Sequence, residues 1–94
     1  MKKVFDERTD ALFEAILSLE TIEECEMFFQ DICTIKEIQD LSQRYEVARL
    51  LADGYPYQEI ARLTGASTAT ISRVNKAMQY GEGGYQIALD RREK

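Results

Sequence analysis

The 94-residue chain has no histidine, two cysteines and one proline. It also has no apolar run near the ~20 residues that a membrane-spanning helix requires. Without histidine it lacks the commonest general base and cannot form a Ser-His or Cys-His pair. Two thiols without histidine do not make a zinc ligand set. We therefore expect no enzymatic activity, no metal site, no cofactor and no membrane partner.

The two cysteines, Cys25 and Cys33, are eight residues apart. On one helix this spacing is a rise of ~12 Å, whereas a disulfide requires Cα atoms within ~7 Å. We expect both to be buried and reduced.

The net charge is −5, and acidic and basic residues are unevenly distributed. Residues 1–40 carry four basic and eleven acidic side chains, whereas residues 41–94 carry eight basic and six acidic ones. The second part can therefore present a locally cationic surface, so the net charge does not exclude nucleic acid as a partner. The N-terminal lysines are followed by acidic residues rather than by a signal-peptide core, so we expect a cytoplasmic location.

Apolar residues recur at helical spacing throughout, without the alternation of strands, so the sequence predicts one all-α domain over residues 1–94. Thr21 and Thr34 each precede a glutamate by three residues, as in a capping box that begins a helix. A first helix is expected to begin at Thr9 or Asp10. Further helices are expected to begin near Ser42, Tyr57 and Ser67, and a last one to span Tyr85 to Arg92. Gly54 and Pro56 are expected to end the helix before them.

The apolar side of the central segment is broad, since Tyr45, Val47, Ala48, Leu50 and Leu51 cover much of its circumference. A monomer of this size would leave part of such a surface exposed. We expect a homodimer with a dimerisation core over about 10–53 and 84–92, although a compact helical monomer could also bury these residues.

Residues 57–78 predict a helix-turn-helix. The first helix spans about 57–64, with Ile60 and Leu63 on its inner side. Gly65 suits the turn, because it adopts a left-handed conformation without a Cβ clash. Ser67 is a favourable N-cap for the second helix.

On a helical wheel, Ile71, Val74 and Met78 share one side of the second helix. The opposite side carries small side chains and two cations. Small residues allow close approach to the major groove, and cations neutralise phosphates. The candidate DNA-binding residues of this segment are Ser67, Thr68, Ala69, Thr70, Ser72, Arg73 and Lys76.

The first turn of this helix has no arginine, asparagine or glutamine, so bidentate contacts to bases are scarce there. Methyl and hydroxyl contacts, bridging water and DNA shape would then carry the specificity. Gln58 and Arg62, on the preceding helix, are candidates for phosphate contact, and Arg62 could equally be a free surface residue.

These segments resemble the Trp repressor family, especially its TrpR-related YerC/YecD branch. The similarity covers about Thr34 to Arg92 and is densest in GASTATISR (65–73) and SQRYEVARLLADG (42–54). The resemblance implies an all-helical, interlocked homodimer with two helix-turn-helix units.

The resemblance also implies an effector pocket. Arg44 and Arg73 match the two arginines that hold the tryptophan corepressor in Trp repressor. Val74 stands where that family has a glycine that leaves room for the indole ring, and Ala77 stands where it has a serine. We expect that tryptophan is not the corepressor. The alternative roles for these arginines are binding of a different effector, contact with a phosphate, and an ion pair with a nearby carboxylate.

The sequence thus predicts a sequence-specific transcriptional regulator, a repressor that binds double-stranded DNA at an inverted repeat. The alternative is a helix-turn-helix adaptor that mediates protein–protein interaction.

Overall fold

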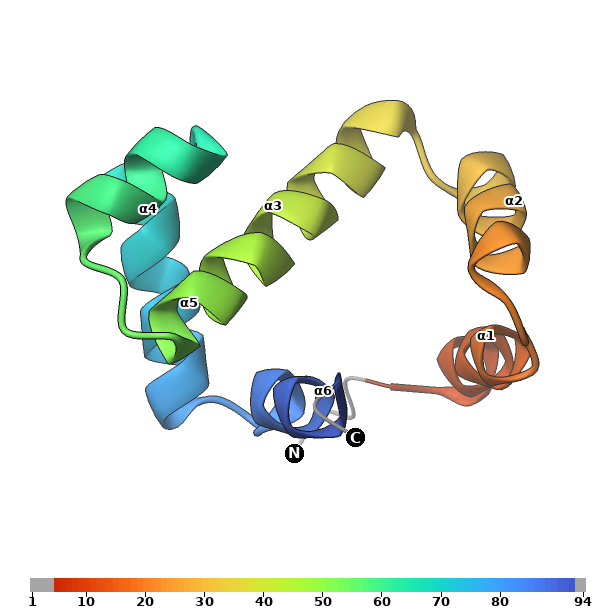
Figure 1. The fold of residues 1–94 in the computed structure, drawn as a ribbon. Helices are drawn as coiled ribbons and strands as arrows, with labels where there is room; N and C mark the ends of the chain where they lie inside the picture. Colours follow the sequence, from red (N-terminus) through yellow and green to blue (C-terminus); the bar gives the residue numbers. More distant parts are fainter. Residues whose placement is uncertain (1–4, 93–94) are drawn as a thin grey trace. The chain divides into compact units, whose positions relative to one another are not determined.

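The computed structural model describes residues 5–92, and within that range it has six helices and no strand. The helices are α1 (Glu7–Leu17), α2 (Ile22–Ile32), α3 (Ile35–Ala52), α4 (Tyr57–Thr64), α5 (Thr68–Tyr80) and α6 (Gly84–Arg92) (Figure 1). The all-α prediction is confirmed. The N-terminal lysines, on which part of the cytoplasmic expectation rests, lie outside the described residues. None of the helices in this range is both long and apolar enough to span a membrane.

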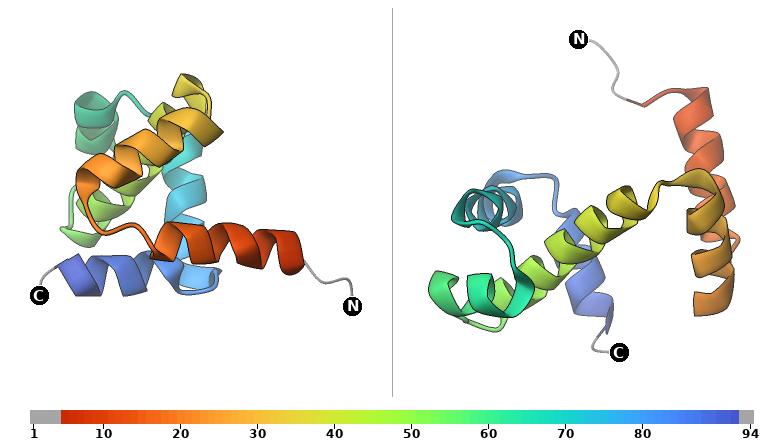
Figure 2. Two further views of the ribbon diagram at one scale, coloured as in Figure 1. Left: turned by 90° about the vertical axis from the view of Figure 1, so that its right-hand side faces the viewer. Right: turned by 90° about the horizontal axis from the view of Figure 1, so that it is seen from above.

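The chain divides into two units, and the boundary between them lies within α3, between Ile38 and Gln39. The N-terminal unit contains α1 and α2, two rods joined by a short connection (Figure 2). Neither helix buries a single residue. Large apolar side chains are exposed on both, among them Leu17 and Ile22, which are 84% and 74% exposed.

End caps define the limits of these two helices. The Thr21 hydroxyl accepts a hydrogen bond from the Glu24 N–H at 3.0 Å, so the expected N-cap forms. The return bond differs from that of a capping box, because the Glu24 carboxylate accepts from the N–H of Glu20, one residue before the cap. The prediction for α1 was wrong by about one turn, because Asp6 caps it by accepting from the Thr9 N–H at 3.0 Å.

Both cysteines are free thiols, as expected. Their predicted burial was wrong: Cys25 is exposed and Cys33 is half-buried. Cys25 lies on α2, which has no core to cover it.

The C-terminal unit holds the core, and α5 contacts both α4 and α6 within it (Figure 1). The buried core cluster comes from α3, α4 and α5 and the turn between the last two, and consists of Val47, Ala48, Leu50, Ile60, Ala66, Ile71 and Val74. Leu89 of α6 is buried as well. Burial of a large aliphatic side chain contributes about 1.5–3 kcal/mol to stability.

α3 is one continuous helix, so the expected new helix at Ser42 was wrong. Its N-terminus has the second capping box, in which Thr34 and Glu37 exchange hydrogen bonds through their side chains and backbone N–H groups. Its end follows the prediction: Gly54 has a φ of 89°, and its N–H and that of Tyr55 donate to the carbonyls of Leu51 and Leu50. This is a Schellman motif, which satisfies carbonyls that a helix end leaves free.

A tight turn joins α4 to α5. Gly65 adopts the left-handed conformation, with φ 75°, and its N–H donates to the Ala61 carbonyl. Ser67 caps α5 by accepting from the Thr70 N–H at 3.1 Å. Both predictions are confirmed. The expected inward position of Leu63 was wrong, because its side chain is 49% exposed, while Ile60 is fully buried.

Candidate nucleic-acid interface and adjoining pocket

α5 has one buried side and one exposed side. Ile71 and Val74 are 0% and 3% exposed, and Met78 packs partly buried against the same core. The opposite side faces outward, as the wheel predicted. Its exposed members, which we call the outer strip, are Thr68, Ala69, Ser72, Arg73 and Lys76.

The outer strip consists of small side chains and two cations, so it protrudes little and is positively charged. Methyl and hydroxyl groups cover its N-terminal half, and its two cations follow toward the C-terminus of the helix. Neither Arg73 nor Lys76 pairs with a carboxylate within residues 5–92. The surface therefore combines close steric access with cations available for phosphate.

Thr70 and Ser67 differ from the other candidates on this helix. The Ser67 hydroxyl accepts from the Thr70 N–H and donates to the Thr70 hydroxyl at 3.1 Å. Thr70 is half-buried and faces away from the outer strip, into a cavity. Both hydroxyls thus serve the end of the helix, which leaves them less available to a base than those of Thr68 and Ser72.

The two candidates on α4 are both exposed. Arg62 is not a free surface residue, because its guanidinium donates to the Glu59 carboxylate through Nε at 3.1 Å and through a second nitrogen. This hydrogen bond lowers the pKa of Glu59 and raises that of Arg62, since each charge stabilises the other.

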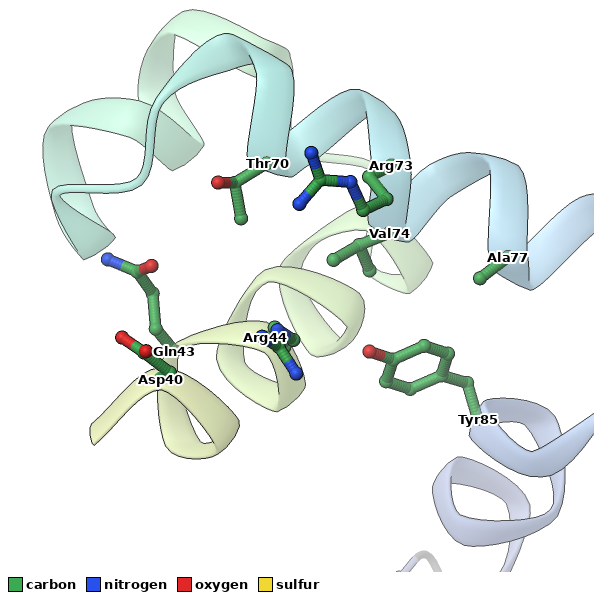
Figure 3. A pocket seen from close by; sticks show the side chains of 8 residues that line it. All are labelled: Asp40, Gln43, Arg44, Thr70, Arg73, Val74, Ala77 and Tyr85. Carbon is green, nitrogen blue, oxygen red and sulfur yellow. The ribbon is translucent and has the colours of Figure 1, made fainter. Parts of the chain in front are cut away.

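A cavity of about 540 Å³ lies between α3 and α5 (Figure 3). It brings together all four residues of the expected effector pocket, which are Arg44, Arg73, Val74 and Ala77. Arg44 of α3 and Arg73 of α5 both line this space (Figure 3), and Arg73, which is exposed, belongs to the outer strip as well. Within the described residues neither has a partner, so the carboxylate pair considered for Arg44 does not form.

The rest of the lining was missed by the sequence reasoning: Asp40, Gln43, Thr70 and Tyr85. The sequence contained a signal for three of these lining residues. Asp40 and Thr70 precede Arg44 and Val74 by four residues and so share their helix faces. Gln43 adjoins Arg44. Tyr85 had none. It reaches the pocket from α6, beyond the glycine-rich break, and its hydroxyl points into the space between Arg44 and Val74 (Figure 3).

Gln43 also connects α3 to α4. Its side-chain amide donates to the Thr64 carbonyl at 3.2 Å, at the last residue of α4. This bond satisfies a carbonyl at a helix end and fixes the α4–α5 turn against α3. Gln43 therefore contributes both to the pocket wall and to the position of the turn.

The family model of the Trp repressor protein matches residues 7–93. The chain is 55% identical to YerC of Bacillus subtilis (strain 168) over 89 residues, which is 95% of this chain and 86% of that protein. It therefore belongs to the Trp repressor family, in the branch that contains YerC.

Two crystal structures are similar in fold. A TrpR-like protein from Eubacterium eligens ATCC 27750 superposes with a TM-score of 0.89 at 51% identity, covering 92% of this chain and 89% of that one. A candidate Trp repressor from Staphylococcus aureus gives 0.92 at 50%, covering 96% and 90%. The expected Trp repressor-like fold is confirmed, and the family is one of DNA-binding transcriptional regulators.

Proposed function

We propose that the protein is a cytoplasmic, sequence-specific transcriptional repressor in which α4 and α5 form a DNA-binding helix-turn-helix. The observation that carries this proposal is the outer strip of α5, whose small side chains face outward, opposite the buried Ile71 and Val74, together with two cations that are unpaired within residues 5–92. A helix of this kind enters the major groove without steric obstruction, and its cations neutralise phosphates.

We further propose a homodimer built on about 10–53 and 84–92. The support is the apolar surface of α1 and α2, on which Leu17 and Ile22 are exposed and which the two helices do not bury between themselves. Two copies would place two α5 helices in successive major grooves about 34 Å apart, so the operator would be an inverted repeat.

Base recognition in this proposal rests on Thr68, Ala69 and Ser72, with Thr70 limited to its methyl group. None of these side chains makes the bidentate contacts that distinguish guanine or adenine strongly. DNA shape and bridging water would contribute much of the specificity.

We propose that tryptophan is not the effector. Val74 lines the pocket and is packed into the core, so an indole ring placed where a glycine at this position would leave room would meet the Val74 side chain. Tyr85 already supplies an aromatic ring to the same pocket. Saturable micromolar binding of tryptophan in a calorimetric titration would contradict this proposal.

Genome-wide selection of bound DNA fragments, followed by a gel shift on the recovered sites, tests the function. We expect an inverted repeat and an affinity that falls steeply with salt, because neutralised phosphates release counterions. Replacement of Arg73 and Lys76 by alanine should reduce DNA affinity at least ~100-fold, since two phosphate contacts per copy are lost. Fragment recovery without enrichment, together with a protein partner whose binding survives this double replacement, would favour the adaptor instead.

A further inference from the structure

Glu59 is the single acidic residue between Tyr57 and Tyr80, the segment that includes α4 and α5. The same segment has three cations, which are Arg62, Arg73 and Lys76. The Glu59 carboxylate forms an ion pair with Arg62, three residues later on α4, and the other two cations have no carboxylate partner in the part of the chain that the structure describes.

The ion pair lies at the surface. The Arg62 side chain is 66% exposed and that of Glu59 is 38% exposed, and both are accessible to a second anion. Exposed pairs of this kind are weak, and their members exchange readily with water and ions. A DNA phosphate that approaches Arg62 must therefore displace the Glu59 carboxylate or share the guanidinium with it, and it also meets the repulsion of that carboxylate.

We propose, on the basis of the proposed DNA-binding function, that Glu59 competes with the DNA backbone for Arg62 and thereby sets how many phosphates the protein neutralises. Arg73 and Lys76 contribute their full charge to the DNA, whereas Arg62 contributes only what Glu59 does not neutralise. Glu59 thus limits the sequence-independent part of the affinity and leaves base recognition on α5 unchanged.

The test is the replacement Glu59→Gln, which removes the charge and nearly preserves the volume. Binding is measured by fluorescence anisotropy over a range of salt concentrations. The probes are a labelled duplex of about 30 base pairs from the fragment selection, long enough for two half-sites, and an unrelated duplex of the same length. We expect the affinity of the variant for each duplex to rise about two- to fivefold for each α4 helix that contacts the DNA. The slope of log affinity against log salt should become steeper by about 0.9 for each copy.

Two features distinguish this result from a general effect of charge. The gain should be equal on both duplexes, because phosphate contacts carry no sequence information. The matched control is Glu46→Gln, which breaks an ion pair of the same spacing between Glu46 and Arg49 on α3 and changes the net charge by the same amount. Because Glu46 lies within the proposed dimerisation core, sedimentation equilibrium first confirms that this variant self-associates as the parent does. The control should then leave both the affinity and the slope at the parent values.

Arg62→Ala completes a double-mutant cycle. In the parent we expect less than a twofold loss, because Arg62 is largely neutralised there, and in Glu59→Gln the same change should remove the whole gain. Equal effects of Arg62→Ala in the two backgrounds, or equal effects of Glu59→Gln and Glu46→Gln, would overturn the inference. A parent chain that binds neither duplex at low salt would overturn the proposed function itself, and the inference with it. Circular dichroism and thermal melting of each variant confirm that the fold is intact.

Discussion

The helix pairs α1–α2 and α4–α5 resemble each other at their ends and differ in what their apolar sides contact. Thr21 begins α2 and Ser67 begins α5 with the same hydrogen bond, in which the side-chain hydroxyl accepts from the N–H three residues later. α4 and α5 then bury Ile60, Ile71 and Val74, whereas α1 and α2 bury nothing. Local sequence is thus sufficient to set helix limits in both pairs, but only the α4–α5 pair has fully buried apolar residues.

This difference assigns the two pairs different roles in our proposal. The α4–α5 pair is a preformed unit whose outer strip can act without rearrangement. The α1–α2 pair exposes apolar side chains, and we propose that a second copy of the chain covers them. Four changes, given from the largest expected effect to the smallest, test the contrast.

Ile71→Ala should reduce the free energy of unfolding by about 2–5 kcal/mol, because it leaves a cavity at a fully enclosed position. Urea denaturation followed by circular dichroism measures the loss. Ser72→Ala, at the next and exposed position of the same helix, should change it by no more than about 0.5 kcal/mol. A similar cost for the two variants would place the core elsewhere.

Leu17→Ser combined with Ile22→Ser should weaken dimerisation about 100-fold, which is about 2.7 kcal/mol. These side chains are exposed in the single chain, so their replacement matters only if a second copy covers them. Sedimentation equilibrium gives the dissociation constant. Leu63→Ser on α4 is the control, since Leu63 is also exposed but lies outside the proposed dimerisation core. Unchanged self-association of the double variant would remove the support for that core.

Ser67→Ala should cost about 1 kcal/mol of stability through loss of the α5 cap, and Ser67→Asn should restore most of it. Thermal and urea unfolding measure both. The corresponding Thr21→Ala should appear as faster amide exchange in the first turn of α2, because no core holds that turn in place. An Ser67→Ala variant as stable as the parent would show that packing alone positions the turn.

The cap of α1 should depend on pH. The Thr9 N–H, and then the Arg8 guanidinium, hold the pKa of Asp6 below its ordinary value of 3.8. A carboxyl whose pKa is lowered by folding stabilises the folded form above its unfolded value, and this contribution is lost as the pH falls through the lowered pKa. The Thr9 amide resonance should therefore shift only below about pH 3.8. Asp6→Asn should abolish that shift, and a Thr9 shift centred above this value would contradict the prediction.

Helix ends were the most predictable part of the fold. The two threonine caps, Ser67, Gly54 and Gly65 all behave as their residue types suggest, because capping and turn preferences act over three or four residues. Ser42 was misread for the same reason. A residue type favoured at caps can also lie inside a helix when the chain on both sides is helical.

Packing across the chain was less accessible to prediction. The wheel of α5 identified the outer strip because one helix alone determines which residues share a side. It could not show that Tyr85 lines the pocket, since that depends on how α6 packs against α5. Leu63 was wrongly assigned to the core because the spacing of apolar residues does not indicate how many residues of a short helix are buried.

The residues of the outer strip take no part in the core. A library that varies Thr68, Ala69 and Ser72 together would therefore sample new sequence preferences without a matching loss of folded protein. In this respect α5 is suited to retargeting by directed evolution: its affinity for a chosen promoter could be selected directly, since few members of the library would be lost to misfolding.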